Sequence, residues 1–335
     1  MAAPSTYTRS NVYKIPKGQV AFQLRRADGS FEGMRFLGNC PAFDLSVETE
    51  NYQHTNSEGG LNTIDLDVPI SVTRASSITV DNMSNDNLAV FIAGTIEDFT
   101  QDTSAVTNEA ITGYQASRTY QLGESQSVSG VRNIGSVTVE FSAATRANST
   151  AYAAGTVVFP TTSNTHAYLC TVAGTSGASE PTYNVAGSTH TDGTATFQDL
   201  GVVTSLTADT DYVVDTTLGL VSVQPTGKLA NAYSAAKTAL GSEPTLSLSV
   251  DYTPGANTRT QIKTGSAGSV EGRIRFLADN PYGDQQDVCI PLCTLKPSGT
   301  LPFVGEGEVA AITFDVGISL LNNSTPAVII EDRGA

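Results

Sequence analysis

The stretch that decides the fold spans residues 41–94 and reads PAFDLSVETENYQHTNSEGGLNTIDLDVPISVTRASSITVDNMSNDNLAVFIAG. In two of its segments, apolar and polar residues alternate, and a polar loop ending in Gly59-Gly60 separates the segments. The apolar positions are Phe43, Leu45, Val47, Ile64, Leu66, Val68, Ile70 and Val72. A period of two is typical of strands with one apolar and one polar face. The stretch therefore predicts a long β-hairpin.

The polar face of this predicted hairpin is acidic. Between Pro41 and Thr73 the chain has no Lys or Arg, and its six carboxylates are Asp44, Glu48, Glu50, Glu58, Asp65 and Asp67. Glu58 falls in the loop. We therefore expect a lysine-free face formed by Asp44, Glu48, Glu50, Asp65 and Asp67.

One short helix is expected after the hairpin. Ile78 and Val80 indicate another short strand, and the side chains of Ser84-Asn85-Asp86 can cap the first amide groups of a helix. Gly94 is well placed to end that helix in a left-handed conformation. Three apolar residues fall on one helical face and predict packing against a sheet: Leu88, Phe91 and Ile92.

The remaining patterns predict a mainly β fold. Residues 20–24 alternate into an Asp28-Gly29 turn and residues 31–37 return, which indicates a first hairpin. Alternation recurs over residues 137–141, 246–252 and 312–320. Several short strands bounded by turn residues favour a β-sandwich or barrel. Residues 1–17 lack periodicity and are expected to form an arm that orders against a neighbour.

Composition restricts the class of protein. The chain has 335 residues, a formal net charge of −15 and a pI near 4.5, so we expect it to repel phosphate backbones and anionic membranes. No apolar run approaches a membrane span, and the first nine residues lack the apolar core of a signal peptide. The four scattered cysteines argue against a disulfide framework and favour folding in a reducing cytoplasm.

Residues 144–203 differ in composition from the rest of the chain. They are rich in Thr, Ser, Ala and Gly, and they carry a net charge of −2, which leaves −13 on the flanking parts. The pattern predicts a small, surface-exposed β module inserted into a discontinuous host domain of residues 1–143 and 204–335.

The sequence offers little for catalysis or metal binding. His54, His166 and His190 are expected to be surface or hydrogen-bonded residues, and no Cys or His pair shows a zinc-site spacing. Cys289 and Cys293 are interpreted as two buried thiols. Residues 305–310 fit G-x-G-x-x-A, but they precede a predicted strand, whereas a dinucleotide motif follows one. We expect no enzyme activity, no metal and no cofactor.

The order of these features resembles the major tail tube proteins of long-tailed bacteriophages. The resemblance covers most of residues 15–143 and 204–325. The segments that carry it are residues 18–22, the hairpin ending in Asp65-Leu66-Asp67-Val68, residues 82–94 with Asn87-Leu88-Ala89, the strand-turn-strand phrase 211–221, and Asn280-Pro281-Tyr282-Gly283. The inserted segment departs from the simplest form of that family. Its ends, residues 151–158 and 192–197, resemble small carbohydrate-binding-like modules of virion proteins.

The resemblance implies a structural role in a virion. Subunits of that family form rings of six that stack into a tube, and hairpins from all subunits form an inner β-barrel. The implied partners are further copies of the chain, a tape measure protein, and tail terminator and distal tail proteins, with double-stranded DNA passing through without specific binding. The expected place is the phage tail, assembled in the host cytoplasm, and a surface module favours a non-contractile tail.

Within that expectation, the two faces of the hairpin have separate roles. The acidic residues line the lumen, and the apolar face packs outward under the helix at Leu88, Phe91 and Ile92. Six residues of the predicted polar loop are expected to contact the next ring: Tyr52, His54, Asn56, Glu58, Gly59 and Gly60.

Two other functions remain open at this level. The chain could be an adhesin that binds polysaccharide or a host receptor through residues 144–203. It could also be a glycoside hydrolase that uses acidic residues such as Glu48 and Asp65, although it has no tryptophan on which a sugar ring could stack.

Overall fold

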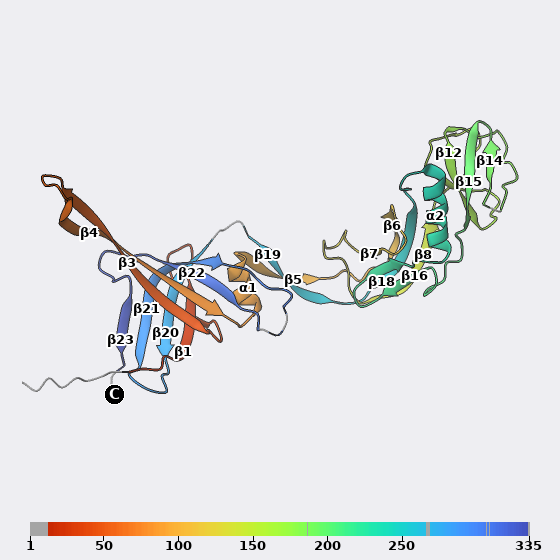
Figure 1. Ribbon diagram of the computed structural model, residues 1–335. Helices are drawn as coiled ribbons and strands as arrows, with labels where there is room; N and C mark the ends of the chain where they lie inside the picture. Colours follow the sequence, from red (N-terminus) through yellow and green to blue (C-terminus); the bar gives the residue numbers. More distant parts are fainter. Residues whose placement is uncertain (1–12, 186, 266–268, 306, 308, 334–335) are drawn as a thin grey trace, which may run out of the picture. The chain divides into compact units, whose positions relative to one another are not determined.

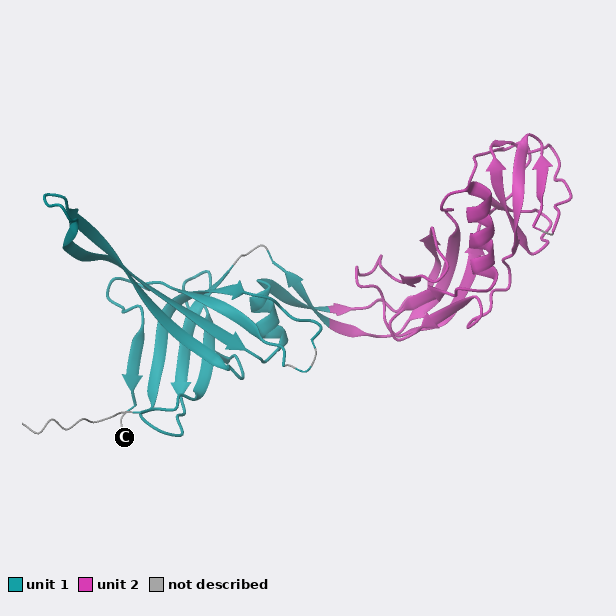
Figure 2. Ribbon diagram, viewed as in Figure 1, with its two compact units in different colours: residues 1–98, 260–335 teal, residues 99–259 magenta. Residues whose placement is uncertain are grey.

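The computed structural model describes residues 13–185, 187–265, 269–305, 307 and 309–333. Most of the predicted arm, residues 1–12, and positions 306 and 308 of the glycine-rich motif lie outside these ranges. The chain divides into two compact units, unit 1 with residues 1–98 and 260–335, and unit 2 with residues 99–259 (Figure 2). The chain is mainly β, as predicted, with 50% of its residues in strands and 6% in helices.

Unit 1 is built on one open sheet (Figure 1). Its strands follow the order β2-β1-β20-β21-β22-β4-β3, and β23 also pairs with β21. Their bounds are β1 Gly18–Leu24, β2 Arg35–Phe36, β3 Ala42–Asn56, β4 Thr63–Val80, β20 Val270–Ala278, β21 Gln286–Ser298, β22 Ile312–Ile318 and β23 Ile329–Asp332. Two further strands, β5 Gly94–Thr100 and β19 Thr258–Thr264, pair with each other.

The hairpin at residues 41–73 forms as expected, but its second strand is longer. Ile78 and Val80, which were expected in a separate strand, lie in the same 18-residue strand β4 as Ile64 and Leu66. No turn residue interrupts residues 70–80, so the ladder continues until Val80 pairs with Ile312 of β22.

The predicted helix is α1, Asn85–Phe91. The Ser84 side chain accepts a hydrogen bond from the Asn87 amide, which confirms the expected cap. The expected end at Gly94 is wrong. Ile92 is the C-cap and Ala93 takes the left-handed conformation with φ of 48°, while Gly94 already begins β5.

The core of unit 1 lies between α1 and the sheet. Phe91 is buried and packs edge-on against Phe314, with ring centroids 5.8 Å apart. Ile92 is partly buried against the same cluster, whereas Leu88, the third residue expected to pack there, is half-buried and outside it. Asn87 also anchors the helix, since its Nδ2 donates to the carbonyls of Leu37 and Asn82.

Unit 2 contains two three-stranded sheets and a second helix. One sheet joins β6 Val106–Thr112, β18 Ser247–Pro254 and β8 Ile134–Ser142, and the other joins β16 Tyr212–Asp215, β17 Leu220–Val223 and β7 Thr119–Gln121. The helix is α2, Lys228–Leu240.

The sequence analysis did not predict α2. Its buried positions are mostly small, namely Leu229, Ala230, Ala232 and Ala236, so the apolar period is weak. The helix start also has no local side-chain cap. Instead the Asp211 carboxylate, 17 residues away, accepts from the Lys228 amide at 2.6 Å.

The predicted module, residues 144–203, lies wholly inside unit 2. It forms a five-stranded sheet in the order β14-β15-β12-β11-β9, and β10 pairs with β13. The strands are β9 Ala144–Thr145, β10 Ala151–Tyr152, β11 Val157–Phe159, β12 His166–Val172, β13 Gly174–Thr175, β14 Thr189–Asp192 and β15 Ala195–Val202. Strand β12 contributes to two cores. Tyr168 and Cys170 face a small core within the module, and Ala167 and Leu169 join the main core of unit 2.

A buried ion pair holds the module together. Arg146 and Asp192 have side chains that are 0% and 1% exposed. The guanidinium donates to both oxygens of Asp192, at 2.9 and 3.0 Å, and to the carbonyls of Gly177 and Ser179. Burial opposes the charge of Asp192, but the hydrogen bonds from Arg146 and Gly177 outweigh it and lower the pKa of this carboxyl.

We predict that Asp192→Asn destabilises residues 144–203 by about 3–5 kcal/mol, because it leaves Arg146 charged, buried and unpaired. Hydrogen exchange of the amides in these residues measures the effect, with Asp209→Asn, an exposed position, as the control. The folded pKa is lowered, so the stabilisation by Asp192 is present above its ordinary value of 3.8 and is lost as the pH falls through the folded pKa. Equal protection in both variants at pH 7 would contradict the role of the pair.

Candidate functional site

The most unusual feature of unit 1 is the hairpin of β3 and β4. The two strands pair from Ala42 opposite Thr79 to Asn56 opposite Thr63. Strand β22 pairs with β4 only from Ala75 to Val80. Beyond Ala75 the hairpin projects from the sheet (Figure 1), and among the described strands nothing pairs with either outer edge. Its backbone groups on both edges are therefore open to another chain.

One face of this projecting hairpin is apolar and exposed. Residues directly opposite each other in an antiparallel pair share a face. Leu45 and Val47 of β3 therefore share a side with Val72, which lies opposite Thr49, and with Ile64, which lies opposite Thr55. Leu66 and Val68 lie opposite His54 and Tyr52 on the other side, because the extra residue Ile70 reverses the alternation in β4. Eight large apolar side chains along the hairpin are 41–60% exposed: Leu45, Val47, Tyr52, Ile64, Leu66, Val68, Ile70 and Val72. Leu45, Val47, Ile64 and Val72, which share one side, are called the apolar hairpin face below.

Helix α1, which was expected to cover this face, does not reach it. The prediction that the face from Phe43 to Ile70 packs under α1 is wrong for every residue beyond Phe43, which alone among those predicted joins the core that contains Phe91. The physical reason is length. Helix α1 has seven residues and lies at the base, while β4 runs from Ile78 to Ile64 over about 45 Å, at about 3.3 Å per residue.

Three predicted lumen residues share the opposite face. Asp44, Glu48 and Glu50 lie opposite Ser77, Thr73 and Ser71, and this side is called the acidic hairpin face below. Asp67 lies opposite Gln53, so the shift at Ile70 places it on the side of Leu45 and Val47 and not with the other three. Arg74, the first cation after Pro41, lies opposite Val47 on that side as well.

The fifth predicted residue, Asp65, is displaced by a β-bulge. The register shifts between Glu50 and Asn51 and again between His54 and Thr55, so that Ile70 and Asp65 have no residue directly opposite them. Asp65 instead contacts His54, with 2.6 Å between Oδ1 and Nδ1. A sequence signal for the first shift was available in Pro69, because a proline within a strand marks an edge or a bulge.

The predicted ring-contact loop is shorter than expected. Tyr52, His54 and Asn56 belong to β3, and only residues 57–62 connect the strands, including Glu58, Gly59 and Gly60. Tyr52 lies opposite Val68, on the side of Glu48 and Glu50, and is 53% exposed. Asn56 stays at the turn, where its side-chain oxygen accepts from the Glu58 amide at 2.8 Å. The β-propensity of Tyr52 and Thr55 explains the extra length of the strand.

The histidines and cysteines make no metal site within the described residues. His166 Nδ1 lies 2.8 Å from Asp199 Oδ1, and His190 packs edge-on against Tyr183 with centroids 4.2 Å apart. Burial lowers the pKa of His190, which keeps its ring neutral at pH 7. Cys170 is buried and free.

The later cysteines are also free thiols. Cys289 is partly buried and Cys293 is fully buried, and burial raises the pKa of Cys293 to about 12. The prediction of two buried thiols is confirmed for Cys293 and only in part for Cys289.

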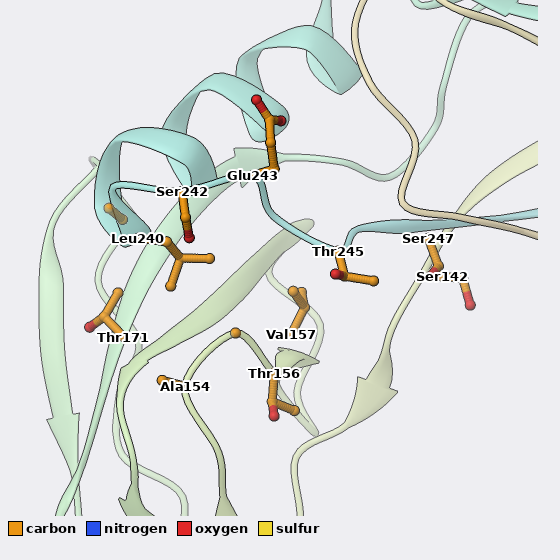
Figure 3. Close-up of a pocket in the computed structure, with 12 residues that line it drawn as sticks. Ser142, Ala154, Thr156, Val157, Thr171, Leu240, Ser242, Glu243, Thr245 and Ser247 are labelled. Carbon is orange, nitrogen blue, oxygen red and sulfur yellow. The ribbon is translucent and has the colours of Figure 1, made fainter.

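The clefts of unit 2 lack a pair of catalytic carboxylates among their described lining residues. Figure 3 shows the cleft of about 760 Å³ near the end of α2, where Glu243 is the one acidic residue and Thr156 and Thr245 supply hydroxyl groups. Glu243 accepts hydrogen bonds from Tyr233 and Lys237. On the hairpin, the register separates Glu48 from Asp65 by about 20 Å along the strands, while glycosidase pairs lie about 5–10 Å apart.

Residues 13–182 match a family described as "Protein of unknown function UCP028589". The match extends over half of the chain. The chain belongs to this family. A search among curated proteins finds no match. The part shared with family UCP028589 contains the whole hairpin, α1 and the first strands of unit 2, so the projecting hairpin lies within the family match. In the described residues, neither helix is long and apolar enough to cross a membrane.

Proposed function

We propose that this chain is a structural subunit that assembles with copies of itself into stacked six-membered rings, forming a tube like those of phage tails. The observation that carries the proposal is the projecting hairpin, whose apolar face is exposed and whose outer edges are unpaired. The ring of six and the tube come from the resemblance in sequence. The implied location is the tail of a virion.

The energetics of the hairpin favour assembly. Full burial of a Val, Leu or Ile side chain contributes about 1.5–3 kcal/mol, so covering eight half-exposed apolar side chains offers a large driving force. Long, exposed edge strands also invite pairing with another chain. A monomer that leaves both features open risks aggregation, whereas pairing in a closed ring turns the same edges into a specific contact.

The acidic hairpin face suits the wall of a DNA conduit. Duplex DNA carries one negative charge per about 1.7 Å of its axis, and lysines in the wall would hold it by releasing counterions. Three carboxylates per subunit give about eighteen in a ring of six, with the same sign as the DNA. Screening over about 8–10 Å weakens the repulsion, which leaves a wall that does not bind.

The role needs no turnover and no cofactor. Its partners would be further copies of the chain along the tube and, from the resemblance, a tape measure protein and terminator and distal tail proteins at the ends. Double-stranded DNA would pass through without specific contacts.

We predict that Ile64→Glu with Val72→Glu abolishes assembly, because two charges enter a face that must become buried. Electron microscopy of the concentrated chain should show rings or tubes for the parent and dispersed subunits for the variant. The matched control is Val128→Glu with Val172→Glu, two exposed apolar residues of unit 2 that are 94% and 55% exposed. Tubes formed equally by both variants would refute the role of the hairpin.

We further predict that Glu48→Lys with Glu50→Lys still allows tubes to form but makes them retain DNA. DNA held in the lumen should be protected from nuclease, and the protection should weaken as salt rises. The control is Glu124→Lys with Asp284→Lys, which changes the net charge equally at exposed positions outside the hairpin. Equal protection in the two variants would rule out an acidic lumen.

A second candidate function is binding of a glycan or receptor by residues 144–203. The observation that favours it is a cleft of about 390 Å³, which includes Asn164, Glu180 and Tyr183 in its lining. The Tyr183 hydroxyl is buried and has no hydrogen-bond partner among the described residues. Buried polar groups are usually hydrogen-bonded, so a ligand in this cleft could supply the partner.

We predict that Tyr183→Phe leaves the fold intact and weakens glycan binding by the full chain. The test is a glycan array read with the parent and the variant, followed by titration of any sugar that binds. Equal binding by both proteins would exclude this cleft, and no binding by the parent would leave assembly as the sole proposed role.

A further inference from the structure

The sheet of unit 1 has a cleft at each end of strands β1 and β20. These strands pair from Leu24 opposite Gly272 to Gly18 opposite Ala278. Near Leu24 and Val270, a cleft of about 380 Å³ has Ala89 and Val90 of α1 in its lining. Near Val20 and Phe276, a larger groove of about 740 Å³ has no residue of α1 among its described lining residues, and it is called the open-end groove below.

The walls of the open-end groove are apolar side chains from strands far apart in the sequence. Phe43 of β3 approaches Phe276 of β20, with ring centroids 5.9 Å apart. Ile330 of β23 lies opposite Val288 of β21 and is 59% exposed. The groove thus exposes part of the core that also contains Phe91 of α1. An exposed apolar surface of this kind favours an apolar occupant.

The groove also carries unpaired positive charge. Lys14 and Lys17 lie in its lining. Lys14 Nζ donates to the Gln286 side chain at 2.8 Å, and neither lysine has a carboxylate within 4.0 Å among the described residues. Asp44 also lies in the lining, so the groove has two lysines against one carboxylate and is net positive in a chain with a net charge of −15. Such a groove favours an occupant that is both apolar and acidic.

The hairpin has this combination. Its apolar face is exposed, and it has carboxylates and no Lys or Arg from Pro41 to Thr73. The hairpin of the same copy cannot fill the groove, because Leu45 already lines the groove while Ile64 lies about 45 Å further along β4. The groove and the apolar hairpin face are also continuous, since both include Leu45.

We propose that the open-end groove is the docking site for the apolar hairpin face of a second copy of this chain. This inference rests on the proposed self-assembly and names the surface that receives the hairpin. Each copy then gives a hairpin to one neighbour and accepts a hairpin from another. Such a head-to-tail contact closes into a ring when its rotation allows. Asp67, which lies on the same side as the apolar hairpin face, then approaches Lys14 and Lys17.

The first test is Ile330→Glu, which puts a charge in the groove at an exposed position. We expect the concentration needed for assembly to rise at least about tenfold. Val304→Glu, at a 94% exposed residue of unit 1 outside the groove, should assemble like the parent. Circular dichroism of both variants checks that the sheet is intact.

The second test needs no disruption of the groove. Cys40 is a native thiol in the groove lining, so a short bismaleimide should join it to a cysteine placed on the apolar hairpin face of a neighbour by Val72→Cys. A cysteine on the opposite face of the same hairpin, Ser71→Cys, should not be joined to Cys40. Burial raises the pKa of Cys40 to about 11, so the reaction should be run at alkaline pH. Cys40→Ser must remove the product.

The outcomes separate this inference from the proposed function. Impaired assembly of Ile330→Glu together with a Cys40 link to position 72 supports the docking. Normal tubes from Ile330→Glu, or assembled tubes without that link, overturn the docking and leave self-assembly standing. A parent chain that forms neither rings nor tubes at any concentration overturns both.

Discussion

The structure depends on one constraint: apolar side chains that alternate along a strand must be covered on one side. In the first part of unit 1 the constraint is met within the chain, since Ile78, Val80 and Phe314 are buried beneath α1. Along the rest of the hairpin it is not met, and the same alternation continues into solvent. The difference between these two parts of one strand is the strongest indication that the chain is a component of something larger.

The acidic hairpin face follows from the same alternation. Because successive residues of a strand point to opposite sides, a chain that fixes one face as apolar leaves the other free to be selected for charge. Asp44, Glu48 and Glu50 occupy that free side, and Arg74 and Asp67 are on the other one. Assembly and repulsion of DNA can therefore be encoded in one hairpin without competing for the same positions.

Strong periodicity made much of this predictable. The hairpin, the cap of α1 at Ser84 and the mainly β class follow from local pattern and turn chemistry. What failed depended on contacts distant in sequence. Helix α2 is hidden by its small buried residues and capped by Asp211 from another segment. The left-handed residue at Ala93 replaces the expected glycine. The sequence also could not predict that the apolar hairpin face is exposed. An alternating pattern indicates which residues share a face of a strand, but it does not indicate whether another segment covers that face.

The two register shifts in the hairpin have a consequence for shape. A β-bulge increases the local twist and bends the strand that contains the extra residue. Here both extra residues, Ile70 and Asp65, belong to β4, so both bends are built into the same strand. Every copy of the chain has the same bends, and a slip of one residue would turn the apolar side chains to the wrong side. The two bends of β4 therefore set the curvature of any wall made from these hairpins. That curvature in turn sets the width of the space that the wall encloses.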